Sequence, residues 1–162
     1  MLDFGGTGRT PTMPAMFQPS QQDVRRFFCE AWRKQREGLP LDAMEAKAAP
    51  WLAEHPEYDA ELSDVEAALA RSYSVEQGRE NPFLHLSMHL SIAEQCSIDQ
   101  PRGVRHAVQQ LAARRSSLHA AHHEAMECLG EMLWRSQRSG LPPDGEAYLE
   151  ALSRRAAGQP HK

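Results

Sequence analysis

The sequence predicts an all-α protein, folded as a small single-domain antiparallel helical bundle. Apolar residues recur at intervals of three and four along most of the chain, and no alternating strand pattern of useful length occurs. Short connections rich in proline and glycine separate these segments, which favours antiparallel neighbours. The chain has 162 residues, of which 41% are hydrophobic and 25% charged, as is typical of one soluble globular domain.

Start and stop signals divide the first half of the chain into helical segments. Ser20, with Asp23 three residues later, resembles a capping box that begins the first helix, and Gly38 ends that helix. We expect Pro50 to bend or split the second helix near residue 49, because proline lacks the N–H that a helix interior uses. The expected helical segments of the whole chain are 20–38, 42–55, 58–62, 65–71, 82–97, 101–115, 117–139 and 144–156.

The second half begins with the strongest helical pattern, which starts near Pro82. Asn81 is the expected N-cap of that helix. Asp99 is expected to cap the next helix, with Pro101 in its first turn, and a break at 116–117 separates that helix from a long one.

Three regions are expected along the chain. Residues 1–15 are predicted to be a disordered leader, because they are rich in Gly, Thr and Pro and lack the apolar core of a signal peptide. Residues 16–156 are predicted to form the all-helical domain, and residues 157–162 a frayed tail. Met16 precedes the first helical pattern and is an alternative start of translation.

The net charge and the cysteine content indicate which partners and which cellular compartment to expect. A formal net charge of -4 argues against broad nucleic-acid binding, and no apolar run approaches the roughly 20 residues of a membrane helix. The cysteines, Cys29, Cys96 and Cys128, are odd in number and form no CxxC pair, which indicates reduced thiols. We therefore expect a cytoplasmic protein without nucleic-acid or membrane partners. A protein partner stays open.

Histidines carry the main functional signal. His85 and His89 are four residues apart, which places both imidazoles on one helix face, and His119 and His123 repeat this spacing. Two such helices packed side by side would offer four imidazoles to one ion. Glu127, one turn beyond His123, is predicted to be a fifth ligand or to orient an imidazole. Imidazole-rich ligation suits a transition metal such as zinc or iron better than magnesium or calcium.

Helical periodicity refines this metal-site prediction. At about 100° per residue, His85 and His89 fall in line with apolar residues and should point inward. His122 lies near the centre of the apolar face of its helix, with His119 and His123 at its edge. The HExxH and ExxH metal motifs are absent from the sequence.

One alternative to a metal site stays open. Buried histidines can be structural, paired with carboxylates or carbonyls, and the protein would then be a non-enzymatic protein-interaction module. The segment His55-Pro56-Glu57-Tyr58 could contribute a loop-held histidine to a site, although a helix stop is the favoured interpretation. Whether the protein is an enzyme is not decided by any pattern in the sequence.

The sequence also resembles a bacterial family of uncharacterised proteins, the domain of unknown function 1841 family, over about Met16 to Ala156. The resemblance implies a small cytoplasmic all-helical domain with no assigned activity. It places histidines at His85, His89, His119 and His123 in the family motif, and not at His122. The matching residues are Asn81-Pro82-Phe83-Leu84-His85, His89, Asp99-Gln100-Pro101, His119, His123 and Met126-Glu127-Cys128-Leu129-Gly130-Glu131, with Phe27-Phe28, Trp32 and His55-Pro56-Glu57-Tyr58.

Overall fold

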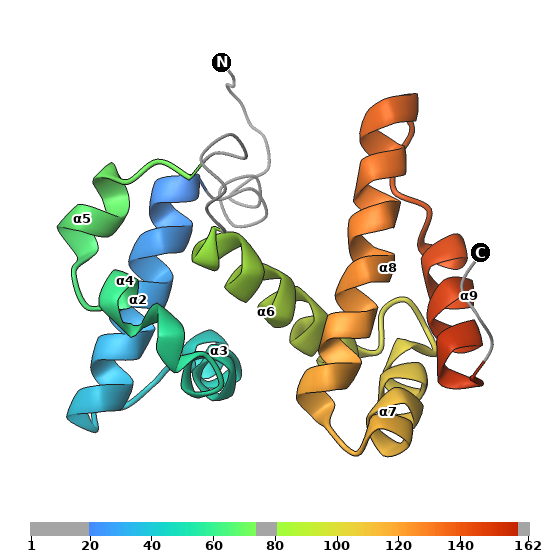
Figure 1. Ribbon diagram of the computed structural model, residues 1–162, viewed down its shortest axis with the longest axis horizontal. Coiled ribbons are helices and arrows are strands. Elements are labelled where there is room, and N and C mark those ends of the chain that lie inside the picture. Colours follow the sequence, from blue (N-terminus) through green and yellow to red (C-terminus); the bar gives the residue numbers. More distant parts are fainter. Residues whose placement is uncertain (1–19, 74–80, 159–162) are drawn as a thin grey trace. The chain divides into compact units, whose positions relative to one another are not determined.

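The structure, a computed structural model, describes residues 20–73 and 81–158 (Figure 1). Every regular element in these residues is a helix, which confirms the all-α prediction. The elements are α2 (Gln21–Glu37), α3 (Ala43–Ala53), η1 (Pro56–Tyr58), α4 (Asp59–Leu62), α5 (Val65–Ala70), α6 (Pro82–Ile98), α7 (Val104–Arg115), α8 (Leu118–Ser139) and α9 (Gly145–Ala156).

Contacts divide the chain into two compact units, Met1–His85 and Leu86–Lys162. The boundary falls inside α6, so the first turn of that helix belongs to the first unit and the rest to the second. The single domain over 16–156 stays a prediction. The predicted leader, 1–15, lies outside the described residues, as does the predicted tail beyond residue 158.

In the first unit, α2 is the central element and contacts α3, α4 and α5. Its amphipathic pattern buries Phe28 and Ala31, which are 2% and 0% exposed. Ser20 caps the helix by accepting a hydrogen bond from the Asp23 N–H, and Gly38 ends it in the left-handed conformation that glycine adopts without strain. The remaining core comes from Cys29, Ala48, Ala49, Trp51, Leu52, Tyr58, Leu62, Ala68 and Phe83.

The sequence predicts that the second helix bends or splits at Pro50, and the structure shows no split; a bend stays a prediction. Pro50 lies inside α3, and the helix continues to Ala53. An internal proline costs a helix about 3 kcal/mol, but burying a large side chain returns about 1.5–3 kcal/mol. Trp51 and Leu52, which follow the proline, are 6% and 2% exposed, so their burial offsets the lost backbone hydrogen bond.

The first unit also buries a cation. Arg25 is only 6% exposed, and its Nη1 donates to the carbonyl oxygens of Ala68 and Arg71, each at 2.7 Å. The guanidinium also lies over the rings of Tyr73 and Phe83, at 5.2 and 5.6 Å from their centroids. Hydrogen bonds and aromatic faces together replace the water that this charge has lost.

The second unit is built on α8, which contacts both α7 and α9. The helices α8 and α9 follow one another through a short connection and run antiparallel (Figure 1). One apolar cluster fills this unit, and α6 contributes Ile92 to it. Its other members are Val104, Ala107, Val108, Leu111, Ala121, Ala125, Met126, Cys128, Leu129, Tyr148, Leu152 and Ala156.

Helix ends from α6 onward follow the sequence signals with one exception. The Asn81 side chain accepts from the backbone N–H groups of the first turn of α6, as predicted. The predicted break at 116–117 is found, and Ser117 caps α8 there. Pro101, however, precedes α7 instead of lying in its first turn, because the helix begins at Val104. Asp99 still acts as a cap from a distance, since its carboxylate accepts from the N–H groups of Gly103 and Arg105 at 3.1 Å.

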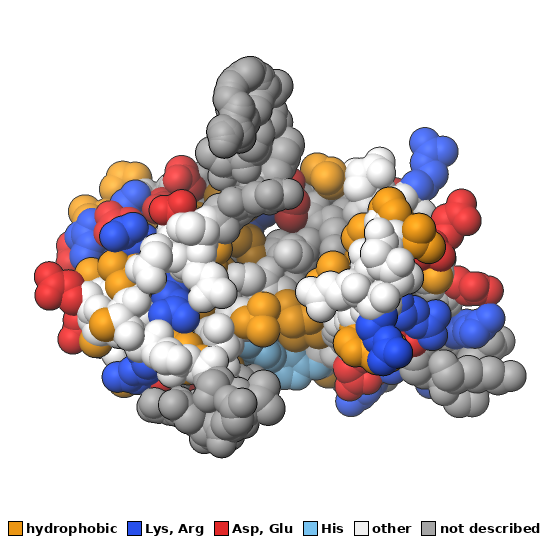
Figure 2. Space-filling view, turned by 90° about the horizontal axis from the view of Figure 1, so that it is seen from above, with side chains coloured by type: hydrophobic (Ala, Val, Ile, Leu, Met, Phe, Trp, Pro, Cys, Tyr) orange, Lys and Arg blue, Asp and Glu red, His pale blue; other side chains and the backbone are white. Residues whose placement is uncertain are grey.

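The surface carries both charge signs. On the face that Figure 2 shows, acidic and basic side chains are intermixed, and histidine side chains reach the surface. In the described ranges, no helix combines the length and the apolar character that crossing a membrane requires. The three cysteines form no disulfide, as predicted.

Candidate metal centre

The first unit fixes the orientation of one histidine through the backbone. His55 follows α3 and is 2% exposed, and its Nδ1 lies 2.8 Å from the carbonyl oxygen of Trp51. A carbonyl oxygen can only accept, so Nδ1 must carry the proton and donate it. The lone pair of neutral His55 is therefore on Nε2.

That lone pair faces a second histidine. The Nε2 atoms of His55 and His85 are 3.1 Å apart. Two nitrogens that ligate one tetrahedral ion at 2.0–2.1 Å are separated by about 3.3–3.4 Å. The pair therefore fits a shared ion with a shift of a few tenths of an ångström, and without an ion His85 Nε2–H would donate to His55.

An aromatic ring supports this pair. Tyr58 is 8% exposed, and its ring is stacked on that of His55, with centroids 5.2 Å apart and planes 4° from parallel. The Tyr58 ring also meets His85 edge-on at 6.1 Å. These contacts restrict both imidazoles to one arrangement.

The second unit brings four histidines together. His89, on α6, is completely buried, and its ring centroid lies 5.4 Å from those of His119 and His123 and 5.3 Å from that of His122. His119 and His123, one turn apart on α8, have centroids 4.4 Å apart. This unit therefore gathers His89 of one predicted pair with both members of the other.

Within this group His122 contacts His89 directly. Their Nδ1 atoms are 3.2 Å apart, and His122 is 2% exposed. Burial, together with the nearby His119 and His123, lowers the pKa of His122 to about 3. His122 is therefore a neutral imidazole at physiological pH.

Glu127, predicted as a ligand or orienting group, has a different partner. Its carboxylate forms an ion pair of 2.9 Å with Arg155, and its side chain is 67% exposed. Arg155 also lies 3.6 Å from Glu124. The structure thus places Glu127 in a surface ion pair of α8 with α9.

The histidines that could hold a metal ion are His55, His85, His89 and His123. The nitrogens of His89 and His123 lie within 4.8 Å of one another in the second unit, and those of His55 and His85 are paired in the first. His85 and His89 are one turn apart on the continuous helix α6. A donor set made of imidazole nitrogens suits zinc or iron, as the sequence predicts.

His55 was outside the ligand set predicted from the sequence. It lies 30 positions before His85 and belongs to no helical repeat, so spacing could not find it. The only signal was the segment His55-Pro56-Glu57-Tyr58, in which a polar group with an aromatic neighbour ends a helix.

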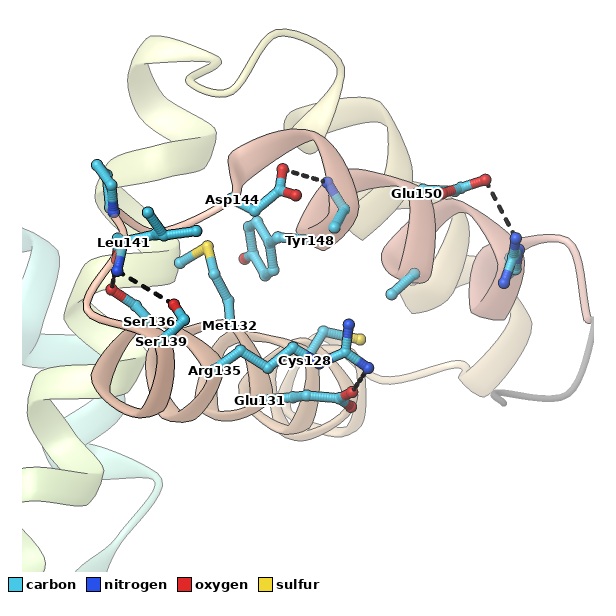
Figure 3. A pocket seen from close by; sticks show the side chains of 14 residues that line it. Cys128, Glu131, Met132, Arg135, Ser136, Ser139, Leu141, Asp144, Tyr148 and Glu150 are labelled. Atoms are coloured by element: carbon cyan, nitrogen blue, oxygen red, sulfur yellow. Dashed lines mark hydrogen bonds and ion pairs between the residues drawn. The ribbon is translucent and has the colours of Figure 1, made fainter.

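A separate pocket of about 330 Å³ lies between α8 and α9. Figure 3 shows Met132 and Tyr148 in its middle, with charged side chains around it. The charged groups neutralise each other, because Arg135 pairs with Glu131 at 2.5 Å and Arg154 with Glu150 at 3.1 Å. This pocket therefore offers no converging polar groups of the kind that the histidines provide.

A scan against protein families matched residues 20–154 to the domain of unknown function DUF1841. The chain belongs to this family. The match covers the described helices of both units almost completely, and it confirms the resemblance found in the sequence. Searches of the curated proteins and of the solved structures gave no match.

Proposed function

We propose that this DUF1841 protein binds one transition-metal ion, zinc or iron, through His55, His85, His89 and His123. One observation carries the proposal: the Nε2 atoms of His55 and His85 are 3.1 Å apart, and the Trp51 carbonyl leaves a lone pair on the first of them. Neutral imidazoles at this spacing are held as two ligands of one ion require.

The histidines of the second unit give independent support. His89 and His123 offer nitrogens within 4.8 Å of each other, and His123 is exposed, which gives an ion a path from solvent. Because α6 is continuous, His85 and His89 project from the same face of one helix. This ligand set contains His55 in place of His119. It leaves out Glu127, which the sequence predicts as a fifth ligand or as a group that orients an imidazole.

The chemistry of the proposed ligands fits a divalent ion. Imidazoles are neutral donors, so an ion with four of them keeps its full charge, and such sites bind zinc, iron or copper before magnesium or calcium. When bound, the ion would stabilise the folded state, because the unfolded chain has no preformed site for it.

Elemental analysis of untagged protein tests the proposal. We expect about one zinc or iron per chain in the wild type and strongly reduced metal in His55→Ala and His89→Ala. His106→Ala is the matched control, because His106 is an exposed histidine on α7 and should leave the metal content unchanged. Circular dichroism would show that each variant is folded.

The same measurement separates the two ligand sets. Glu127→Ala should retain its metal if the carboxylate only forms the ion pair with Arg155. The variant would lose its metal if Glu127 were a ligand. A wild-type protein that contains no metal and does not take up added Zn²⁺ or Fe²⁺ would overturn the proposal.

A further inference from the structure

One buried histidine, His122, has no place in the proposed ligand set but contacts a member of it. Its Nδ1 lies 3.2 Å from Nδ1 of His89, and the two rings are stacked with planes 23° apart. An imidazole that is buried without hydrogen-bond partners for its nitrogens destabilises the folded protein. The contact of His122 with a proposed metal ligand therefore needs a chemical explanation.

The position of one proton explains the contact. When His89 binds an ion through Nε2, that nitrogen supplies its lone pair, so the proton of the neutral ring lies on Nδ1. His89 Nδ1–H must then donate, and the atom facing it at 3.2 Å is Nδ1 of His122. His122 accepts only when its own proton lies on Nε2, so one contact fixes the tautomers of both rings.

We infer that His122 is a positioning residue, which accepts the hydrogen bond from His89 and directs His89 Nε2 at the metal ion. The inference rests on the proposed function. Histidine ligands generally donate their second N–H to a carboxylate, a carbonyl or water. In this protein the hydrogen-bond acceptor would be a neutral histidine on α8, and the donor would be a proposed ligand on α6.

The surroundings of His122 keep it in place. It is 2% exposed and lies on the buried face of α8, with Ala121 and Ala125 completely buried beside it. The ring therefore has little room to turn away from His89, which is itself completely buried. Two rigid rings in contact define the direction of Nε2 more closely than a mobile surface group could.

Substitutions at His122 test the inference, with Co²⁺ as a spectroscopic probe of the site. His122→Leu keeps the approximate volume but removes the acceptor, and we expect it to weaken Co²⁺ binding about 10–100-fold at unchanged stoichiometry. His122→Asn places an amide oxygen near the position of Nδ1, so it should restore affinity to within about threefold of the wild type. The visible absorption of bound Co²⁺ should change in the Leu variant and return in the Asn variant.

A matched control separates positioning from general loss of stability. Leu152→Ala removes a completely buried side chain of α9 in the same core, so it should lower stability and leave Co²⁺ affinity unchanged. Wild-type affinity in His122→Leu would overturn the inference. Loss of the ion in both His122 variants would also overturn it, by making His122 a ligand. If the wild type itself binds no Co²⁺, both the inference and the proposed function fail.

Discussion

In the first unit the ring of His55 is fixed by a backbone carbonyl, whereas in the second unit the ring of His89 lies against another imidazole. The contact in the first unit is 2.8 Å from Nδ1 to the Trp51 oxygen, and the contact in the second is 3.2 Å between two Nδ1 atoms. In the proposed site, both arrangements would leave Nε2 as the nitrogen that binds the ion. The first depends on the end of a helix, and the second depends on one replaceable side chain.

The two units also differ in the polar side chains that they bury. The first unit buries Arg25, Glu45 and His55, and the second buries His89 and His122. In the first unit the buried charges serve the fold, since Arg25 binds carbonyl oxygens and Glu45 pairs with Lys34 at 3.1 Å. In the second, both buried polar residues are imidazoles in contact. The comparison indicates that buried polar groups of the second unit are concentrated where the function is proposed.

The largest expected effect is the loss of a ligand from either unit. His55→Ala and His123→Ala should each weaken Zn²⁺ binding about 100–1,000-fold, because a binding free energy of about 10–16 kcal/mol is shared among four ligands. Competition with a chromophoric chelator measures it. If only one of the two variants lost affinity, the ion would be bound by the histidines of a single unit.

The next effect tests the buried cation of the first unit. Arg25→Leu should lower the free energy of unfolding by at least about 2 kcal/mol, because one buried and one partly buried carbonyl oxygen lose a charged donor. Arg26→Leu is the control, since Arg26 is exposed, and it should change stability by less than about 0.5 kcal/mol. Urea denaturation measures both. Equal effects would show that Arg25 contributes no more than a surface arginine.

A smaller expected effect is a loss of folding stability at alkaline pH, caused by a buried thiol. Burial, together with the charge of Asp64, raises the pKa of Cys29 to about 11, and burial also raises the pKa of Cys128 against the opposing charge of Arg155. The unfolded thiol loses its proton first, near its ordinary pKa of about 9, so Cys29 makes stability fall as pH rises from about 9 to 11, by at most about 1.4 kcal/mol per unit.

Cys29→Ala should reduce this alkaline slope, which denaturation at pH 8, 9, 10 and 11 would show. Below about pH 8 the thiol is protonated in both states and contributes no slope. An unchanged slope in Cys29→Ala would mean that the thiol titrates alike in the folded and unfolded protein.

The smallest expected effect concerns the aromatic support of His55. Tyr58→Leu should weaken Zn²⁺ binding by no more than about tenfold, because an aromatic contact contributes about 0.5–1.5 kcal/mol beyond its buried area. Tyr58→Phe keeps the ring and should bind as the wild type does. A larger loss in Tyr58→Phe than in Tyr58→Leu would indicate that the hydroxyl, and not the ring, supports the site.

The sequence predicts those features that depend on neighbours in the chain. Ser117 and Gly140 mark the ends of α8 because capping uses residues within one turn, and the His119–His123 pair is found by its spacing. His122 is also found on the buried face of α8, as periodicity predicts.

Features that depend on distant residues escape sequence reasoning. His55 meets His85 across 30 positions, and Glu127 meets Arg155, which no local period relates to it. Pro50 shows the same limit for the fold, because the burial of Trp51 and Leu52 outweighs the local penalty of the proline. In each case tertiary packing decides the outcome, and a single sequence does not contain its geometry in local form.

The coordination of the ion is the central claim, and X-ray absorption spectroscopy of the zinc-loaded protein tests it most directly. We expect four nitrogen neighbours at about 2.0–2.1 Å with the outer-shell scattering of imidazole rings, and one fewer imidazole in His55→Ala. A sulfur neighbour at about 2.3 Å, or a shell made mainly of oxygen, would contradict the four-histidine site.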